Sequence, residues 1–205
     1  MAEIRKDFRY KIIRGFFNPP ELNLLQNYCS GLLDTPFNIP NQRLESSFSI
    51  AFSYDNLMET FLRIKKPLVE KETKLNLCET YSYWRWYGYT SELKNHSDRP
   101  ACEISVTACI NKTHNWPLII NKKQVEIEIG DGLLYLGTED DHSRKGIYTG
   151  DGLAQVFMHY IDINGPFTHH AKDDYRISYE KQWAPGDKQL LKNLKEKNGK
   201  QKKRN

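Results

Sequence analysis

Apolar and polar residues alternate at the start of the chain and then recur with helical spacing. The segment FRYKII at residues 8–13 alternates apolar side chains with basic ones, as a half-buried strand does. A helix is expected next, because Asn18 can cap it and Pro19 and Pro20 suit its first turn. Apolar residues at three- and four-residue spacing through residues 22–33 give this helix one apolar face, which should cover a flat surface.

A second helix is expected after Asp55, whose carboxylate can accept hydrogen bonds from the first turn of a helix. Leu57, Phe61 and Ile64 are expected to share its apolar face. Pro67 should limit or kink this helix, because proline lacks the backbone N–H that the helix ladder needs. Both helices fall in the first third of the chain, and the rest of the chain is expected to be mostly strand.

The middle and late parts of the chain show the two-residue period of strands. TYSYWRWYGY at residues 80–89 places tyrosines and Arg85 on one face and two tryptophans on the other. ACEISVTACI at residues 101–110 alternates strictly, with Cys102 and every second residue after it expected to point inward. The last clear strand is AQVFMHYIDI at residues 154–163. Shorter strands are expected in WPLII, QVEIEI and LLYLG.

Short strands separated by turn residues, after an N-terminal helical block, indicate a mainly β fold of the α+β kind. We expect a double-stranded β-helix, or jelly roll, with the N-terminal helices supporting one face. A chain of 205 residues with 39% hydrophobic residues can bury one core of this size. Residues 1–186 are therefore interpreted as a single domain.

The charge is unevenly distributed along the chain. The formal net charge is +4, but residues 187–205 contain eight basic and two acidic residues. This segment therefore has a charge of +6, which leaves −2 for residues 1–186. We interpret residues 187–205 as a basic, flexible or helical tail. Such a tail can attract nucleic acid or an anionic surface, although a solvated chain end is the interpretation we favour.

The chain is expected to be cytoplasmic and to have no membrane span. Its first ten residues are charged and lack the apolar region of an export signal. No apolar run approaches the roughly 18 residues that a membrane span needs. The four cysteines include no C-x-x-C pair and lie in hydrophobic segments, which indicates reduced thiols rather than disulfides.

The segment KNHSDRP places His96 and Asp98 two positions apart. Side chains two positions apart on an extended backbone point the same way, so this imidazole and this carboxylate can converge on one ion. Chance also produces such pairs, but a third donor, His142, lies just beyond the buried segment LLYLG. Two histidines and one carboxylate form the facial triad of non-haem iron(II) oxygenases, which leaves three metal positions open.

Four landmarks with this motif at their centre occur in a familiar order. They are IIRGFFNPPELNLLQNYC, YSYWRWYGYTSELKNHSDRP, EIGDGLLYLGTEDDHSR and QVFMHYID. They look like an opening strand with its support helix, the strand leading into H-x-D, the strand leading into the distal histidine, and the closing strand. By these landmarks the chain resembles, over nearly its whole length, the iron(II)- and 2-oxoglutarate-dependent dioxygenases, specifically their prolyl 4-hydroxylase-like branch.

The resemblance implies that His96, Asp98 and His142 are the catalytic iron ligands. Related halogenases lack the carboxylate, so Asp98 favours hydroxylation. The implied cofactor is Fe(II), with 2-oxoglutarate and O2 as co-substrates and ascorbate as a reductant. The implied reaction hydroxylates a C–H bond, with a prolyl residue in a peptide or protein as the favoured target, and releases succinate and CO2.

The far carboxylate of 2-oxoglutarate needs a cation, which many relatives place on the last core strand. Here the corresponding segment, TGDGLAQVF, contains no Lys or Arg. The nearest candidates are Arg144 and Arg85, of which we favour Arg144, with Tyr83 as a hydrogen-bonding helper. A surface ion pair is the alternative for either arginine.

Other histidines have simpler interpretations. His159 is expected to be a packed core residue, with a supporting contact to a metal ligand as the alternative. His169 and His170 fall outside the predicted strands, in GPFTHHAKDD, where a polar loop is favoured over a second metal site.

The substrate and partners follow from the resemblance rather than from the residues. A peptide or protein is the favoured partner, and a small molecule or a methylated nucleic acid are alternatives within the same chemistry. A jelly-roll binding module that has lost catalysis is the main competing class. The complete set of His96, Asp98 and His142 argues against that class.

Overall fold

The computed structural model describes residues 10–34, 42–45, 48–172 and 186–202. The α-helices are α2 (Pro19–Leu33), α3 (Asn56–Thr73) and α4 (Asp187–Lys202), and two short 3-10 helices are η1 (Pro100–Cys102) and η2 (Thr168–His170). The strands are β1 (Tyr10–Ile13), β2 (Gln42–Glu45), β3 (Ser49–Ser53), β4 (Leu77–Tyr87), β5 (Ile104–Lys112), β6 (Leu118–Ile120), β7 (Lys123–Val125), β8 (Gly132–Tyr135), β9 (His142–Arg144) and β10 (Leu153–Asp162). Phe8 of the expected first strand and residues 203–205 of the tail lie outside the described residues.

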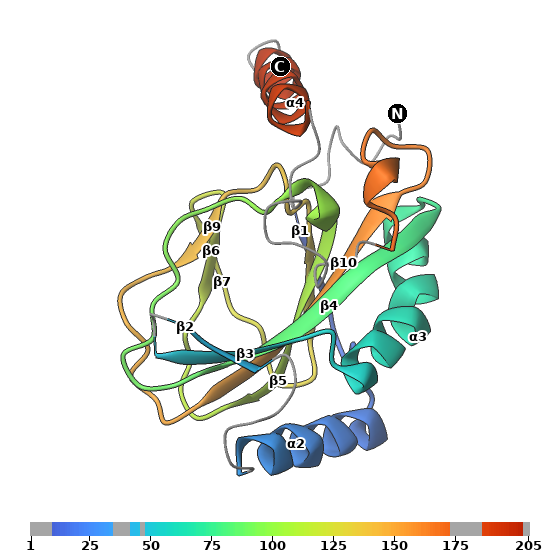
Figure 1. The fold of residues 1–205 in the computed structure, drawn as a ribbon. Helices are drawn as coiled ribbons and strands as arrows, with labels where there is room; N and C mark the ends of the chain where they lie inside the picture. The colour runs from blue at the N-terminus through green and yellow to red at the C-terminus, as the bar shows by residue number, and fades with distance from the viewer. Residues whose placement is uncertain (1–9, 35–41, 46–47, 173–185, 203–205) are drawn as a thin grey trace.

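Two antiparallel sheets face each other (Figure 1). The larger sheet has the strand order β1-β8-β5-β10-β4-β3-β2, and the smaller has the order β7-β6-β9. Consecutive strands of the chain are often not neighbours in the sheets, as in a jelly roll. The predicted jelly-roll core with N-terminal support helices is confirmed.

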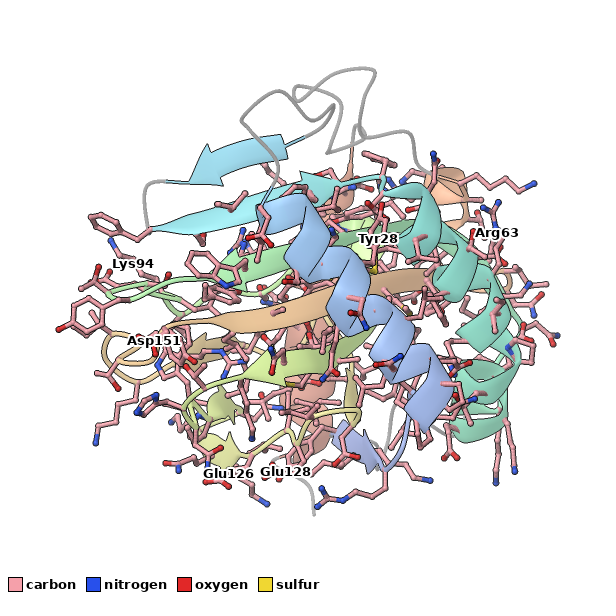
Figure 2. The ribbon with its side chains drawn as sticks, turned by 90° about the horizontal axis from the view of Figure 1, so that it is seen from below. Tyr28, Arg63, Lys94, Glu126, Glu128 and Asp151 are labelled. Carbon is pink, nitrogen blue, oxygen red and sulfur yellow. The ribbon has the colours of Figure 1, made fainter. Side chains whose placement is uncertain are left out.

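Helices α2 and α3 cover the outer face of the larger sheet, where Figure 2 shows α2 crossing the strands. Asn18 caps α2 with a complete capping box that includes Glu21, and the Asp55 carboxylate accepts from two backbone amides at the start of α3. Beneath the helices Trp84 is fully buried and stacks on Phe52 at 4.1 Å. Both expected helix starts are confirmed.

The buried face of α3 differs from the expected one. Phe61 is buried as expected, but Ile64 is 55% exposed. The other buried positions of the helix are Met58, Leu62, Lys65, Val69 and Thr73. Positions 58, 62, 65 and 69 repeat at three and four residues, and Ile64 lies away from the face they form. Pro67 does not end the helix, which continues to Thr73.

Strand β5 is buried on both faces. Its apolar residues, beginning with Ile104 and Val106, belong to the core beneath the helices. The alternate positions Ser105, Thr107 and Cys109 are also buried and therefore face the space between the two sheets. The interior of the barrel thus receives the polar face of this strand, and that face borders the candidate site.

Helix α4 lies at one end of the barrel, apart from α2 and α3 (Figure 1). Leu191 and Leu194 pack against Ile161 and Phe167 of the body. The division of the chain at residue 186 stays a prediction. Within the described residues, every helix is too short or too polar to cross a membrane.

We expect Asp55→Ala to destabilise the fold, because Asp55 joins the two support helices. Its carboxylate caps α3 and also accepts a hydrogen bond from the Tyr28 hydroxyl of α2 at 2.5 Å. Losing both should lower the free energy of unfolding by about 2 kcal/mol, measured by urea denaturation. Tyr28→Phe removes only the link between the helices and should cost about 1 kcal/mol. Equal effects of the two substitutions would contradict a capping role.

Candidate metal centre

Backbone hydrogen bonds join the two segments that hold the predicted ligands. The His96 amide donates to the His142 carbonyl at 3.0 Å, and the His142 amide donates to the His96 carbonyl at 2.8 Å. The Asp98 amide donates to the carbonyl of Gly137, which follows β8 closely, at 2.8 Å. A loop after β4 is thereby fixed against β9 and the end of β8, so residues 46 positions apart in the chain become neighbours.

The three side chains converge at this point. Asp98 Oδ1 lies 3.7 Å from His96 Nε2 and 3.6 Å from His142 Nε2, and the two imidazole centroids are 4.3 Å apart. One potential ligand atom from each group lies within 4.8 Å of the other two. The structure therefore brings together all three residues that the sequence singled out as iron ligands.

Backbone carbonyls determine which imidazole nitrogens face the carboxylate. His96 Nδ1 lies 2.8 Å from the Lys94 carbonyl, and His142 Nδ1 lies 2.9 Å from the Asp140 carbonyl. A carbonyl only accepts, so in the neutral imidazole each Nδ1 carries the proton and each Nε2 keeps its lone pair. Both lone pairs are thus available for a metal ion.

The electrostatics of the site also suit a bound cation. Burial raises the pKa of the Asp98 carboxyl, although His142 and His96 act in the opposite direction. Burial lowers the pKa of His142, which keeps this imidazole neutral. Two imidazoles and one carboxylate match the donor set of a divalent first-row metal. Ligand atoms about 2.1 Å from one ion lie about 3 Å apart at right angles, so small shifts would complete the site.

Ser105, Tyr135 and His159 form a buried polar group next to Asp98. The Ser105 hydroxyl lies 2.9 Å from His159 Nδ1 and makes a long contact of 3.5 Å to Asp98 Oδ2, and the Tyr135 hydroxyl donates to the same oxygen at 3.4 Å. Burial, with a smaller effect from Arg99, lowers the pKa of His159 to about 3, so its ring stays neutral. His159 is thus buried as expected and is linked through Ser105 to Asp98.

Gly137 is required by this crowding. A Cβ atom built there would lie 2.6 Å from both Asp98 Oδ2 and Ser105 Oγ, and still closer to the Cys102 carbonyl. Neither Gly137 nor Ser105 nor Tyr135 was among the site residues predicted from the sequence. For Ser105, the signal in the sequence was the polar pair Ser105 and Thr107 at alternate positions of the otherwise apolar strand β5.

Arg144 extends from β9 into the barrel interior. Its side chain is buried, its guanidinium donates to Gln155 Oε1 at 2.7 Å, and it lies 5.0 Å from the centre of the Trp116 ring. Among the residues that the structure describes, no carboxylate forms an ion pair with Arg144. Its Nε is buried and has no hydrogen-bond partner there. Arg144 thus lies in the interior, where it is hydrogen-bonded to Gln155, and not in a surface ion pair with any described residue.

Arg85 and Tyr83 lie on the interior face of β4, as expected. The Arg85 guanidinium is 5.7 Å from the Tyr83 ring and 5.4 Å from the Tyr87 ring. Tyr83 stacks on Phe157 at 4.5 Å, and its partial exposure leaves it accessible. In the sheet, Arg85 is paired in register with Gln155, to which Arg144 donates a hydrogen bond. Arg85 and Arg144 therefore approach the same residue of β10.

Comparisons with solved structures find oxygenases with this architecture. The non-heme alpha-ketoglutarate-dependent epimerase SnoN from nogalamycin biosynthesis is 12% identical, with a TM-score of 0.62 over 78% of this chain and 80% of SnoN. A viral collagen prolyl hydroxylase from Paramecium Bursaria Chlorella virus-1, in complex with 2-oxoglutarate, is 12% identical, with a TM-score of 0.56 over 77% and 98%. EctD from S. alaskensis, with 2-oxoglutarate and 5-hydroxyectoine, is 15% identical, with a TM-score of 0.60 over 75% and 72%.

No protein-family model and no curated protein matches the chain. At identities this low, similarity in structure shows a shared fold. The chain has the jelly-roll fold that these 2-oxoglutarate-dependent oxygenases share.

Proposed function

We propose that this protein is an Fe(II)- and 2-oxoglutarate-dependent oxygenase that hydroxylates a C–H bond. The observation that carries the proposal is the convergence of His96, Asp98 and His142, whose imidazole Nε2 atoms lie 3.7 and 3.6 Å from Asp98 Oδ1. A purely structural cluster has no need to expose His96, whose side chain is 42% accessible. That exposure provides a route for substrate and dioxygen.

The iron bound by these three groups would supply the oxygen chemistry, with 2-oxoglutarate as the co-substrate. The chain's own contribution is to hold the ligands and their protons. The Lys94 and Asp140 carbonyls fix the imidazole tautomers, and the Ser105 and Tyr135 hydroxyls make long contacts of 3.5 and 3.4 Å to the second oxygen of Asp98. Such supporting hydrogen bonds keep ligands oriented.

Arg144 is our candidate for the anchor of the far carboxylate of 2-oxoglutarate. Burying a guanidinium without an anion is costly, and burial lowers the pKa of Arg144 accordingly. A carboxylate bound in the barrel would offset that cost, and the planar guanidinium can bind it through paired hydrogen bonds. Arg85 is the alternative anchor, and Tyr83 is the proposed hydrogen-bonding helper.

The proposed substrate is a prolyl residue of a peptide or protein, supported by the resemblance of the motif-bearing segments to prolyl 4-hydroxylases. A small molecule or methylated nucleic acid would use the same iron chemistry. Tyr83, which is half-buried on the interior face of β4, offers apolar surface for a ring such as that of proline. A binding module without catalysis is the competing class, and measurements of iron binding and of turnover separate it from an enzyme.

Asp98→Ala should abolish iron binding at this site, because it removes the only anionic ligand of the triad. We expect at least about 100-fold weaker Fe(II) binding by anaerobic equilibrium dialysis, and about 10-fold weaker binding for Ser105→Ala. Asp151→Ala removes an exposed carboxylate elsewhere and serves as the control. Fe(II) binding by Asp98→Ala equal to that of the wild type would refute the assignment.

Turnover should appear when the purified protein is incubated with Fe(II), ascorbate and 2-oxoglutarate. We expect succinate, increased by proline-rich peptides that gain one oxygen atom by mass spectrometry, and no succinate from Asp98→Ala. Succinate without any peptide effect would reject the prolyl substrate and leave the enzyme class standing. No succinate, together with no iron-dependent thermal shift, would favour the binding module.

The two arginines can be separated by the binding of 2-oxoglutarate. Because Arg144 lies over Trp116, we expect the co-substrate to change tryptophan fluorescence, with Trp116→Phe as the control for the signal. Arg144→Met should weaken 2-oxoglutarate binding by about 10- to 100-fold, the value of a hydrogen-bonded charge. Arg85→Met should change it little. The reverse result would make Arg85 the anchor.

A further inference from the structure

A second group of metal-binding side chains lies where η2 meets the start of α4. His169 Nε2 lies 2.9 Å from Asp187 Oδ1, and His170 Nε2 lies 2.9 Å from Asp187 Oδ2. The two imidazole centroids are 4.4 Å apart, and one potential ligand atom from each of the three groups lies within 4.8 Å of the others. These residues share no member with the triad at His96, Asp98 and His142.

The donor types and the spacing fit a small divalent cation. Two imidazole nitrogens and a carboxylate are a common ligand set for zinc, with bonds of about 2.0–2.2 Å. His169 Nε2 and His170 Nε2 each lie 2.9 Å from an oxygen of Asp187, whereas a tetrahedral zinc ion with bonds of this length needs ligand atoms about 3.4 Å apart. Shifts of about half an ångström would therefore admit the ion. His170 and Asp187 are buried, whereas the His169 side chain is 43% exposed. The exposed side gives an ion a path of entry and leaves room for water as a fourth ligand.

We propose that His169, His170 and Asp187 form a second metal site, for Zn2+, separate from the proposed iron centre. Three protein ligands with a water in the remaining position would complete a tetrahedral zinc site. This proposal does not rest on the proposed oxygenase activity, because none of the zinc ligands takes part in the iron triad.

A zinc ion there would fasten α4 to the body of the protein. Asp187 is the first residue of α4, and the next turns of the helix pack through Leu191 and Leu194 onto Ile161 and Phe167. Metal binding would therefore be coupled to docking of the helix, since the ligands come from both parts. The helix lies at one end of the barrel (Figure 1).

The docked helix also reaches the loops that hold the iron ligands. Lys195 Nζ donates to the Ser97 hydroxyl at 3.0 Å, and it lies 3.8 Å from Asp141 Oδ1. Ser97 lies between His96 and Asp98 in the chain, and Asp141 precedes His142. A zinc ion that holds α4 would thus steady a contact at the rim of the iron site.

The same three side chains can also form a clamp without metal, in which each imidazole Nε2–H donates to one carboxylate oxygen. The two arrangements differ in one measurable respect, which is bound zinc. In the clamp each Nε2 carries a proton, whereas in the zinc site both are unprotonated ligands. Metal stoichiometry therefore decides between them.

The test is equilibrium dialysis of the untagged full chain against Zn2+, with elemental analysis of the dialysed protein. Because zinc can also enter the triad, the comparison uses the Asp98→Ala background. We expect two equivalents in the wild type, one in Asp98→Ala and none in Asp98→Ala/His169→Gln. Asp98→Ala/His114→Gln removes an exposed histidine elsewhere and should keep one equivalent. Absence of zinc from Asp98→Ala, or its retention after His169→Gln, would overturn the proposal in favour of the clamp.

Measurements of Tm and of amide hydrogen exchange distinguish a loss of zinc binding from a failure of the variants to fold. Zn2+ should raise the Tm of Asp98→Ala by about 5 °C at saturating zinc and leave Asp98→Ala/His169→Gln unchanged. It should also slow amide hydrogen exchange in residues 187–202, reversibly with EDTA. Asp98→Ala/Asp187→Asn keeps a hydrogen-bond acceptor and should fold, judged by circular dichroism, yet bind no zinc. Zinc binding by that variant would contradict the proposed ligand set.

Discussion

The paired backbone hydrogen bonds between His96 and His142 are the constraint on which the candidate site depends. They join a loop after β4 to β9 in the opposite sheet, and the Asp98 amide adds a third bond to Gly137. Each imidazole is then oriented by a backbone carbonyl, so the ligand geometry rests on main-chain contacts. Main-chain positions are held by the hydrogen bonds of the barrel, and these contacts keep the three side chains close together.

The two faces of the larger sheet differ in character: the outer face is apolar and packs under the helices, whereas the inner face carries the polar groups near the candidate site. The outer face buries large apolar residues such as Trp84 under α2 and α3, which supplies much of the hydrophobic stabilisation. The inner face carries polar groups such as Ser105 and His159, and these are tolerated because they are hydrogen-bonded to one another near Asp98. Arg144 also lies in the interior, with no carboxylate at ion-pair distance among the described residues, and this observation supports the proposal that it binds an anionic co-substrate.

Helix α4 connects the two candidate metal centres. Its first residue, Asp187, lies between two imidazoles, and Lys195, about two turns later, touches the rim that carries the triad. Between these two residues, Leu191 and Leu194 pack against Ile161 and Phe167 and hold the helix against the body of the protein. The basic segment that looks like a solvated tail in the sequence is therefore, through Lys195, part of the surroundings of the proposed iron site.

The sequence alone determined the elements whose signals are local: the caps of α2 and α3, the alternation of β4 and β5, and the H-x-D pair at His96. The sequence also predicted His142 as the third ligand, because four of its segments resemble, in the same order, segments of the 2-oxoglutarate-dependent dioxygenases. Only the tertiary structure decided which face of β5 lines the site and which residues support Asp98, since both faces of that strand are buried and periodicity cannot distinguish two buried faces. Only the tertiary structure showed strand β9, whose three residues are too few to show a period in the sequence. The position of α4 against the body likewise depends on contacts between distant parts of the chain.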